Sequence, residues 1–290
     1  MQERYVLLTA AKNEEAYITN TIESVLRQSV LPVAWYIMDD GSTDRTAAIV
    51  EGYASKHPFI RLCATERDVM KRDFGAKDRA INAGYARAKQ MEFELVGIQD
   101  ADISPEDNCY YQQVLQLFRD NPRLGIAGGY IYEQSNGVWQ SRKSNSMDSV
   151  AGGIQMFRRS CFDQIGGFTP LRYGGSDSLT QIDARMMGWE IQTLPGQKIL
   201  HYRHSSSAEG KLRGFFRAGF MDASFGVHPI FEFFKCGRRI TSRPFMLGGA
   251  TRFLGYIWWK LSGRKPLIQA DKIAFLRAEQ MSKLKRFMRF

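Results

Sequence analysis

The chain has 290 residues, of which 44% are hydrophobic and 24% charged. This composition is typical of a globular protein and excludes a mainly disordered chain, and the length predicts one large domain or a domain with an appendage. The 40 Lys and Arg residues outnumber the 30 Asp and Glu residues, so the net charge is +10 at pH 7. This charge predicts an anionic partner, which could be nucleic acid, phospholipid or a phosphorylated metabolite.

Apolar runs and helical patterns alternate through the first 130 residues. Apolar runs predict strands at 5–10, 33–39, 60–64, 95–98 and 124–132. Apolar residues at helical spacing predict helices over 13–28, around 49–53, over 74–89 and around 111–118. A polar stretch over 133–149 predicts a surface loop. Apolar segments over 152–157 and 165–168, and a helix over 178–188, are expected to complete the core. Strands that alternate with helices predict an α/β fold with a mostly parallel sheet.

Cysteine usage and the N-terminal sequence bear on the compartment. The four cysteines stand far apart without a CxxC pair, which predicts neither a zinc site nor a disulfide framework and fits a reducing cytosol. The chain does not begin with a basic segment followed by a long apolar stretch, so we expect no signal peptide. No window approaches ~18 uninterrupted apolar residues, so we expect no transmembrane helix.

Polar residues gather where three of the predicted strands end. Thr9 and residues 11–14 close the first strand, Asp39 and Asp40 close the second, and residues 100–102 follow the fourth. Ligands of open α/β sheets bind beyond the carboxyl ends of the strands. We therefore expect these clusters to form the functional site.

The sequence QDAD indicates a cation site. Neither the dinucleotide-binding G-x-G-x-x-G nor the Walker A pattern is present, so phosphate must be held in another way. In an extended segment residues i and i+2 point the same way, so Asp100 and Asp102 can present two carboxylates to one place. Such a pair favours a bound cation, and hard oxygen ligands select Mg²⁺ or Mn²⁺, which commonly bridge to substrate phosphates. The alternative is a solvated turn after a strand.

The sequence IMDDGSTD has two interpretations. Asp and Gly favour turns, and Ser42, Thr43 and Asp44 can cap the helix that follows. A carboxylate at a strand end can also accept a hydrogen bond from a base N–H or a ribose hydroxyl. We assign the capping role to the three later residues and a nucleotide role to at least one of Asp39 and Asp40.

Four segments in order, TAAKNEE, IMDDGSTDRT, GAKDRAINAG and QDAD, resemble the motifs of inverting family 2 glycosyltransferases of the GT-A fold. The resemblance implies a Rossmann-like catalytic domain over 1–205, with helices on both faces of the sheet. Its nucleotide-sugar-binding half would span 1–132 and its acceptor half 150–205. It also implies a UDP-, GDP- or dTDP-linked sugar donor and Mn²⁺ or Mg²⁺. The residues that the resemblance places on the nucleotide sugar are Thr9, Ala11, Glu14, Asp39, Asp40, Lys77, Asn82, Asp100 and Ala101.

An inverting enzyme also needs a general base. The segment YGGSDSLTQIDARMMGW resembles the family's E-D-x-D-L-x-x-R helix entry, which implies that Asp177 is the catalytic base. The chain departs from this pattern, because Ser176 stands in place of Glu, Leu179 in place of the second Asp, and Asp183 in place of Arg. From the residues alone Asp177 could also cap a helix, and the two roles are compatible.

Two histidines in LHYRH are further candidates for the metal site. A lone His is more often structural, but the family has a metal- or phosphate-contacting His soon after this helix. By that resemblance we expect the metal ligands to be Asp100, Asp102 and His201, with His204 as the alternative to His201. Imidazole is an acceptable Mn²⁺ ligand.

The end of the chain differs in charge from the rest. Residues 201–290 hold 18 Lys and Arg and 5 Asp and Glu, a net charge of +13, whereas residues 1–200 hold 22 and 25, a net charge of −3. Apolar and aromatic residues recur there at helical spacing, as in 212–223 and 253–261. Basic, aromatic-rich amphipathic helices bind membrane interfaces, so we expect residues 206–290 to bind an anionic membrane surface. The alternative is that these helices pack on the catalytic domain.

Three segments of this tail, GVHPIFEFFKCGRR, SRPFMLGG and TRFLGYIWWKL, resemble the tails of bacterial exopolysaccharide glycosyltransferases, which act on lipid-linked acceptors. We therefore expect a peripheral enzyme on the cytoplasmic face of the inner membrane that moves a sugar to a hydroxyl of a lipid-linked saccharide. Metal at Asp102 would offset charge on the departing diphosphate, and Asp177 would take the acceptor's proton in a single inverting displacement. The alternatives are a non-catalytic nucleotide-binding partner in a glycan assembly complex and a basic nucleic-acid-binding protein. No nucleic-acid recognition module is visible, so we expect no nucleic acid partner.

Overall fold

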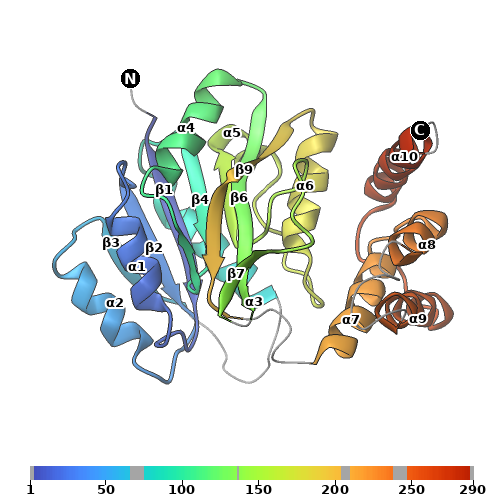
Figure 1. Ribbon diagram of the computed structural model, residues 1–290. Helices are drawn as coiled ribbons and strands as arrows, with labels where there is room; N and C mark the ends of the chain where they lie inside the picture. Colours follow the sequence, from blue (N-terminus) through green and yellow to red (C-terminus); the bar gives the residue numbers. More distant parts are fainter. Residues whose placement is uncertain (1–2, 66–74, 136, 204–209, 238–246, 288–290) are drawn as a thin grey trace. The chain divides into compact units, whose positions relative to one another are not determined.

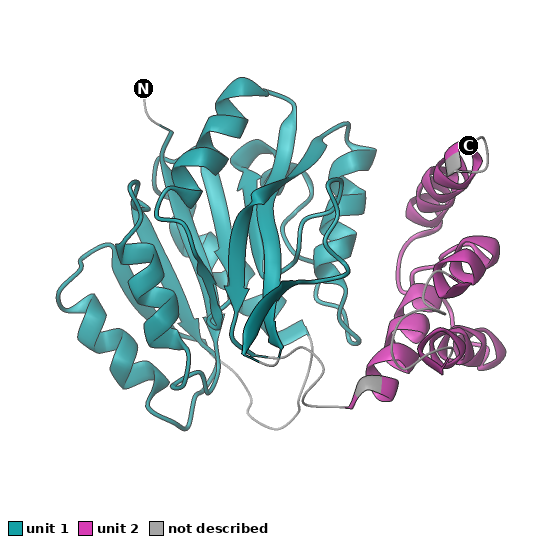
Figure 2. Cartoon of the chain, in the orientation of Figure 1, with its two compact units in different colours: residues 1–204 teal, residues 205–290 magenta. Residues whose placement is uncertain are grey.

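A computed structural model describes residues 3–65, 75–135, 137–203, 210–237 and 247–287 of the chain. The chain divides into two compact units, residues 1–204 and residues 205–290 (Figure 2). The first unit is an α/β domain, and the described part of the second is helical.

A nine-stranded sheet forms the centre of the first unit (Figure 1). Its strands are β1 (Tyr5–Ala11), β2 (Ala34–Asp39), β3 (Ile60–Ala64), β4 (Leu95–Gln99), β5 (Ile103–Pro105), β6 (Leu124–Ser135), β7 (Val138–Ser141), β8 (Ile154–Arg158) and β9 (Glu190–His201). The order across the sheet is β3-β2-β1-β4-β8-β6-β9-β5, with β7 paired to β6. Strands β1, β2, β3, β4, β6 and β9 run one way, and β5, β7 and β8 run against them. The prediction of a mostly parallel sheet is confirmed.

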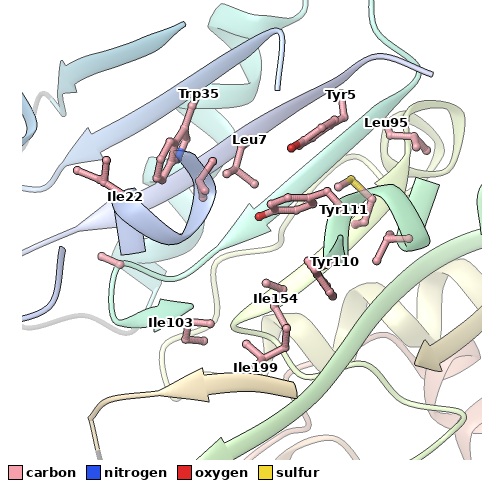
Figure 3. Packing of buried hydrophobic residues seen from close by; sticks show 14 of the residues in the cluster. Tyr5, Leu7, Ile22, Trp35, Leu95, Ile103, Tyr110, Tyr111, Ile154 and Ile199 are labelled. Carbon is pink, nitrogen blue, oxygen red and sulfur yellow. The ribbon is translucent and has the colours of Figure 1, made fainter. Parts of the chain in front are cut away.

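Helices cover both faces of this sheet, as predicted. They are α1 (Ile18–Leu26), α2 (Thr46–Ala54), α3 (Gly75–Ala88), α4 (Tyr110–Asp120), α5 (Arg159–Gln164) and α6 (Ser176–Met186). Side chains of α1, α2 and α4 join one hydrophobic cluster, and those of α3, α5 and α6 join another. Strand β1 supplies Tyr5 and Leu7 to the first cluster and Val6 and Leu8 to the second, because successive side chains of a strand point to opposite faces. Figure 3 shows the first cluster, where the rings of Tyr5 and Tyr111 lie 4.9 Å apart.

Some elements differ from the sequence prediction, each for a physical reason. The predicted helix over 13–28 begins only at Ile18, because Asn13 adopts a positive φ of 54° and the chain turns before the helix starts. The predicted loop over 133–149 contains the end of β6 and the whole of β7, whose polar side chains hid the pairing. Strands β5 and β9 and helix α5 have no clear sequence pattern, since β9 is interrupted by Pro195 and Gly196 and the other two are short.

The described part of the second unit consists of α7 (Lys211–Ser224), α8 (Pro229–Gly237), α9 (Leu247–Leu261) and α10 (Ala270–Phe287). Helices α7 and α9 touch backbone to backbone where each has a glycine. A Cβ on Gly219 would lie 1.8 Å from the Arg252 carbonyl oxygen, and one on Gly255 would lie 2.0 Å from that of Phe216. Within the described ranges, no helix is both long enough and apolar enough to cross a membrane.

Charged side chains lie in the interior of this helical unit. Arg252 of α9 is 5% exposed and pairs with Asp222 of α7 and with Glu232 of α8, whose side chain is fully buried. Lys235 donates to the same Asp222 carboxylate at 2.8 Å. Two acids and two bases therefore hold three helices together from inside.

Candidate active site

Strands that run the same way end at the same edge of the sheet, and the predicted site residues follow those ends. β1, β2, β4 and β9 end at Ala11, Asp39, Gln99 and His201. Strand β8 runs against β4 in the register Gln99↔Ile154, so it begins at this edge, preceded by Gly152 and Gly153. The topology thus brings together segments that are far apart in the sequence.

At the end of β1 the side chains mostly support the backbone. Thr9 is fully buried, donates to the Gln99 carbonyl at 2.7 Å and accepts from the indole of Trp35. Ala11 is buried, and its carbonyl accepts a hydrogen bond from the Asp40 amide at 2.9 Å. Both residues are therefore buried at this edge of the sheet, and their contacts with a nucleotide sugar remain predictions.

The loops after β1 and β2 are hydrogen-bonded to each other. The amide of Asn13 donates to Ser42, that of Glu14 to Thr46, and the side chain of Asn13 accepts from the Thr43 amide at 2.8 Å. Asp44 accepts from the Thr46 amide at the start of α2, as a helix start requires. The cap residue of α2 is Arg45, so none of the three predicted residues is the cap. Ser42 and Thr43 instead join the two loops, and Asp44 contacts the first residue of the helix.

The two aspartates after β2 have different surroundings. The carboxylate of Asp39 accepts from the Ser42 amide at 3.2 Å, which closes its own turn. Asp40 instead lines a cavity of about 350 Å³ and accepts from the Thr65 hydroxyl at 3.1 Å. The other residues that line this cavity are Ala76, Arg79, Ala80, Ala83 and Arg87. A carboxylate and guanidinium groups over a floor of alanines can bind the polar edge of a nucleobase, and the sequence interpretation had not included the two arginines.

Asp100 and Asp102 lie at the end of β4 with different partners. The Asp100 amide donates to the Gly153 carbonyl at 2.8 Å, and its carboxylate forms an ion pair with Lys77 of α3. Burial would lower the pKa of Lys77, but Asp100 and other carboxylates outweigh it and raise the pKa, so the side chain is a cation. Ala101 between them is buried, and its carbonyl accepts from the Thr21 hydroxyl.

His201 reaches Asp102 because β5 and β9 pair in the register Ile103↔His201. His201 Nε2 lies 3.4 Å from Asp102 Oδ2, and His201 Nδ1 lies 3.4 Å from Glu133 Oε1 on β6. Burial would lower the pKa of His201, but hydrogen bonds with both carboxylates outweigh it and raise the pKa to about 9. Of the two predicted histidines, His201 is thus at the site, and His204 lies outside the described residues.

An arginine that the sequence interpretation missed completes this cluster. Arg203 Nε lies 3.3 Å from Asp102 Oδ2, and its Nη2 donates to Glu14. Burial raises the pKa of Glu14 to about 7, with a further contribution from Asp102, although Arg203 opposes both. The only sequence signal for Arg203 was its place two residues after His201.

The predicted base lies in the first turn of α6. The helix is capped by Gly175 at a φ of 95°, so Asp177 is not the cap residue but the second residue of the first turn, where the helix dipole favours a carboxylate. Gly152 packs directly against it, since a Cβ there would lie 2.5 Å from Asp177 Oδ2 and 2.6 Å from Asp177 Cβ. Gln181 holds this segment in place by bonding to both the amide and the carbonyl of Val150.

Lys77 and Asn82 of α3 have unequal access to a ligand. Lys77 lies between the Asp100 carboxylate and the Gly152 carbonyl, which is 3.4 Å from its Nζ. Asn82 donates to the Phe168 carbonyl at 2.7 Å and accepts from the Phe168 amide at 3.0 Å. Both polar atoms of the Asn82 side chain are thus bonded to the backbone of Phe168, so Asn82 holds the loop around Phe168 in place. A contact of Asn82 with the donor remains a prediction.

The residues around Asp102 fit a divalent cation that is shared with a substrate. Among the residues that the structure describes, no three His, Cys, Asp or Glu side chains form a group that could hold a metal ion by themselves. Asp102 offers one oxygen, and His201 offers Nε2 once the imidazole releases the proton that its raised pKa favours, since a metal ligand must be deprotonated. Glu133 on the far ring nitrogen would orient the imidazole as second-layer carboxylates do. Mg²⁺ and Mn²⁺ sites commonly combine one or two protein ligands with water and substrate phosphates.

Comparison with solved structures shows the class of fold. The mannosyltransferase PcManGT from Pyrobaculum calidifontis, solved with GDP-Man and Mn²⁺, has a TM-score of 0.58 at 17% identity, over 98% of this chain and 81% of its own. Staphylococcus aureus TarS 1–349, solved with UDP, has a TM-score of 0.53 at 18% identity, over 74% of this chain and 64% of its own. The fold is that of GT-A glycosyltransferases, as predicted.

Residues 7–179 match Glycosyl transferase family 2, and the chain belongs to this family. The probable glycosyltransferase YdaM of Bacillus subtilis is 27% identical over 65% of this chain and 48% of YdaM. Beta-monoglucosyldiacylglycerol synthase of Synechocystis is 29% identical over 65% of this chain and 37% of that protein. Poly-beta-1,6-N-acetyl-D-glucosamine synthase of Staphylococcus epidermidis is 24% identical over 63% of this chain and 44% of that protein. The chain spans less than half the length of these relatives.

Proposed function

We propose that the chain is an inverting glycosyltransferase that moves a sugar from a UDP-, GDP- or dTDP-linked donor to a hydroxyl of a saccharide acceptor. The observation that carries this proposal is the placement of Asp100 and Asp177 on either side of Gly152 and Gly153. A single displacement needs one general base close to the bound donor, and Asp177 beside the Asp100 end of β4 would meet that need. In this proposal residues 1–205 are the catalytic domain and residues 206–290 a membrane-facing tail.

The donor would occupy the edge of the sheet from β2 to β9. Asp40, Thr65 and Arg79 would bind the base in the cavity beside α3, and Asp100 would accept from the ribose. Asp102 and His201 would hold Mn²⁺ or Mg²⁺, which as a Lewis acid offsets charge on the diphosphate leaving group. Arg203 would release Asp102 and turn to the diphosphate, since a guanidinium binds phosphate with paired hydrogen bonds.

The acceptor would approach from the side of α6. Asp177 would accept the proton of the attacking hydroxyl while the oxygen attacks the anomeric carbon from the face opposite the diphosphate. The C–O bond to the acceptor forms as the bond to the diphosphate breaks, so the configuration inverts. Gly152 would leave the path to Asp177 open, because any side chain there would meet the carboxylate.

The names of the relatives support a lipid-linked or glycan acceptor. One is named as a synthase of poly-beta-1,6-N-acetyl-D-glucosamine and another as a synthase of beta-monoglucosyldiacylglycerol. PcManGT was solved with GDP-Man and TarS with UDP, which supports a nucleotide-sugar donor without choosing the base. We propose a lipid-linked saccharide acceptor in exopolysaccharide or cell-surface glycan synthesis.

Thermal unfolding with UDP-, GDP- and dTDP-sugars, each with and without Mn²⁺, tests the donor site. A ligand at 100 times its Kd should add about 2.7 kcal/mol to the unfolding free energy. Lys211–Phe287 carries no predicted donor contact, so stabilisation should appear in the first unit. If no donor stabilises the protein in a metal-dependent way, the proposed donor site is wrong. Full transfer by Asp177→Asn would show that Asp177 is not the base, whereas absence of transfer by the wild-type protein with every donor would favour the non-catalytic partner.

An exposed apolar surface on α8 and α9 supports the proposal that the second unit binds a membrane. Leu247, Leu254, Trp258 and Leu261 are 57–81% exposed, and their spacing places them on one face of α9. Phe233 of α8 is 64% exposed, and its ring lies 6.4 Å from that of Phe253 on α9. In contrast, Phe220 of α7 packs on Trp259, with ring centroids 4.6 Å apart. Phe220 of the predicted apolar stripe of α7 thus packs inside the unit, whereas Leu212 of that stripe is 47% exposed and the stripe of α9 is partly available.

We propose that this surface lies on an anionic bilayer, since residues 201–290 have a net charge of +13. Sedimentation with phosphatidylglycerol-containing vesicles should fall roughly tenfold or more in Leu254→Ser with Trp258→Ser, because burying one such side chain contributes roughly 1.5–3 kcal/mol. Val138→Ser with Met187→Ser, which removes equally exposed side chains from the first unit, should sediment as the wild type does. Equal sedimentation of both pairs would show that α9 does not contact the bilayer.

A further inference from the structure

The first turn of α3 contacts both sides of the catalytic centre, and the inference drawn from it rests on the function proposed above. Lys77 forms an ion pair with Asp100 and donates to the Gly152 carbonyl at 3.4 Å. The next residue, Asp78, accepts a hydrogen bond from the hydroxyl of Ser176 at 2.7 Å. Ser176 directly precedes Asp177, so two neighbouring residues of α3 reach the donor carboxylate and the base-bearing turn.

The bond between Asp78 and Ser176 is enclosed by protein. Asp78 is 3% exposed and Ser176 is 8% exposed. Burial raises the pKa of the Asp78 carboxyl, and the bond from Ser176 opposes this rise. A buried polar group that loses its partner costs about 1–3 kcal/mol, so this bond holds the start of α6 in one position.

This contact also accounts for a departure of the chain from its family's pattern. The family pattern has Glu before the catalytic aspartate, and this chain has Ser176 there. A Glu side chain at that place would put a second carboxylate beside the buried Asp78, which is unfavourable. A serine hydroxyl can donate to Asp78 instead, so the two residues form a matched pair.

We propose that Asp78 is a positioning residue for the base Asp177, acting through Ser176. It fixes the first turn of α6 so that the Asp177 carboxylate lies against the bare backbone of Gly152. Lys77, in the same turn of α3, holds Asp100. The distance between the donor and the base Asp177 is therefore set by one short segment, the first turn of α3. Asp78 itself touches neither substrate.

Kinetics of transfer with Ser176→Ala and Asp78→Ala test this role. Each variant should lower kcat about 10²-fold, the typical cost of a misplaced catalytic group, while the Kd for the nucleotide-sugar donor stays unchanged. The double variant should be no slower than either single variant, because both remove the same bond. Asp78→Asn keeps an oxygen that can accept from Ser176 and should recover most of the lost rate.

Ser55→Ala is the matched control, since it removes a serine hydroxyl that bonds to the Gly52 carbonyl on the surface of α2. Its kcat should equal that of the wild type. If Asp78→Ala fails to fold, Ser176→Ala, which removes a single oxygen, decides alone. Wild-type transfer by Ser176→Ala, or additive losses in the double variant, would overturn the positioning role. Absence of transfer by the wild-type protein with every donor would overturn the proposed function instead.

Discussion

The two units of the chain place their charges in opposite ways. In the first unit the core is apolar, and the acids and bases gather at the open edge of the sheet, as Lys77 with Asp100 and Arg203 with Asp102 do. In the second unit Asp222, Glu232 and Arg252 form an ion cluster between helices, and large apolar side chains such as Trp258 are exposed. Residues 1–200 have a net charge of −3 and residues 201–290 one of +13.

In the proposed function the charged residues at the sheet edge bind a ligand, whereas the charged residues between the helices stabilise the fold. At a strand end a carboxylate can exchange its partner, so Asp102 can leave Arg203 for a cation. Between helices Asp222, Glu232 and Arg252 have no room for such an exchange, and removing one would leave the others buried and uncompensated. The net charge of the chain is therefore a property of its tail, and in the proposed function the donor is held by particular residues of the acidic first unit.

Asp177→Asn should have the largest effect on the first unit. It removes the proposed base and leaves its shape, so kcat should fall about 10²–10⁴-fold. Stabilisation by the donor should persist, because Asp177 lies on the acceptor side. The measurement is initial transfer rate together with thermal unfolding in the presence of the donor. A fall in donor affinity as large as the fall in rate would place Asp177 on the donor instead.

Arg252→Met should have the largest effect on the second unit. Loss of a partner from a buried ion cluster costs about 3–5 kcal/mol. Hydrogen exchange resolved by peptide should therefore speed up in α7, α8 and α9 and stay unchanged in β1 to β4. Arg264→Met, which replaces an exposed cation near the Trp259 ring, should change little. Equal loss of protection in both units would show that they unfold together and would remove the distinction between them.

Gly152→Ala tests whether the first unit needs a bare backbone at its centre. The new Cβ would meet Asp177 at 2.5–2.7 Å, so the carboxylate must move. We expect kcat to fall about 10²-fold with donor binding retained. Gly52→Ala on α2 adds the same methyl group where no atom lies within 4 Å, and it should be neutral in activity. An active Gly152→Ala would mean that the base does not depend on this contact.

Features within one short segment could be predicted from the sequence, whereas contacts between segments far apart in the chain could not. β1, β4 and the carboxylates after them were predictable, because a buried strand and its polar end lie in one short segment. The contacts of His201 with Asp102 and Glu133 depend on the pairing of β9 with β5 and β6. No local pattern encodes that pairing, since β9 contains a proline and a glycine. The proposed base, Asp177, was predicted only through its family motif, and its contact with Gly152 arises from three-dimensional packing.

The smallest expected effect is a pH dependence that differs between the units. Burial, with a contribution from Asp222, raises the pKa of Glu232 from its ordinary value of 4.5 to about 7. The native state then keeps a proton that the unfolded chain gives up above about pH 4.5. The stability that this proton contributes is complete below that pH and is lost as pH rises toward 7, by at most about 1.4 kcal/mol per pH unit.

Glu232→Gln should remove this slope from α8 and α9, because the amide does not titrate. Glu14, whose pKa is also raised to about 7, should give a slope of the same sign at the edge of the first unit, and Glu14→Gln should remove only that one. Hydrogen exchange resolved by peptide at pH 5 and pH 7, corrected for the intrinsic rate, measures both. Since a donor with its cation would change the charge around Glu14 but not around Glu232, adding donor and Mn²⁺ should alter the first slope alone. A change in both slopes would mean that the buried charges of the helical unit respond to the ligand of the catalytic one.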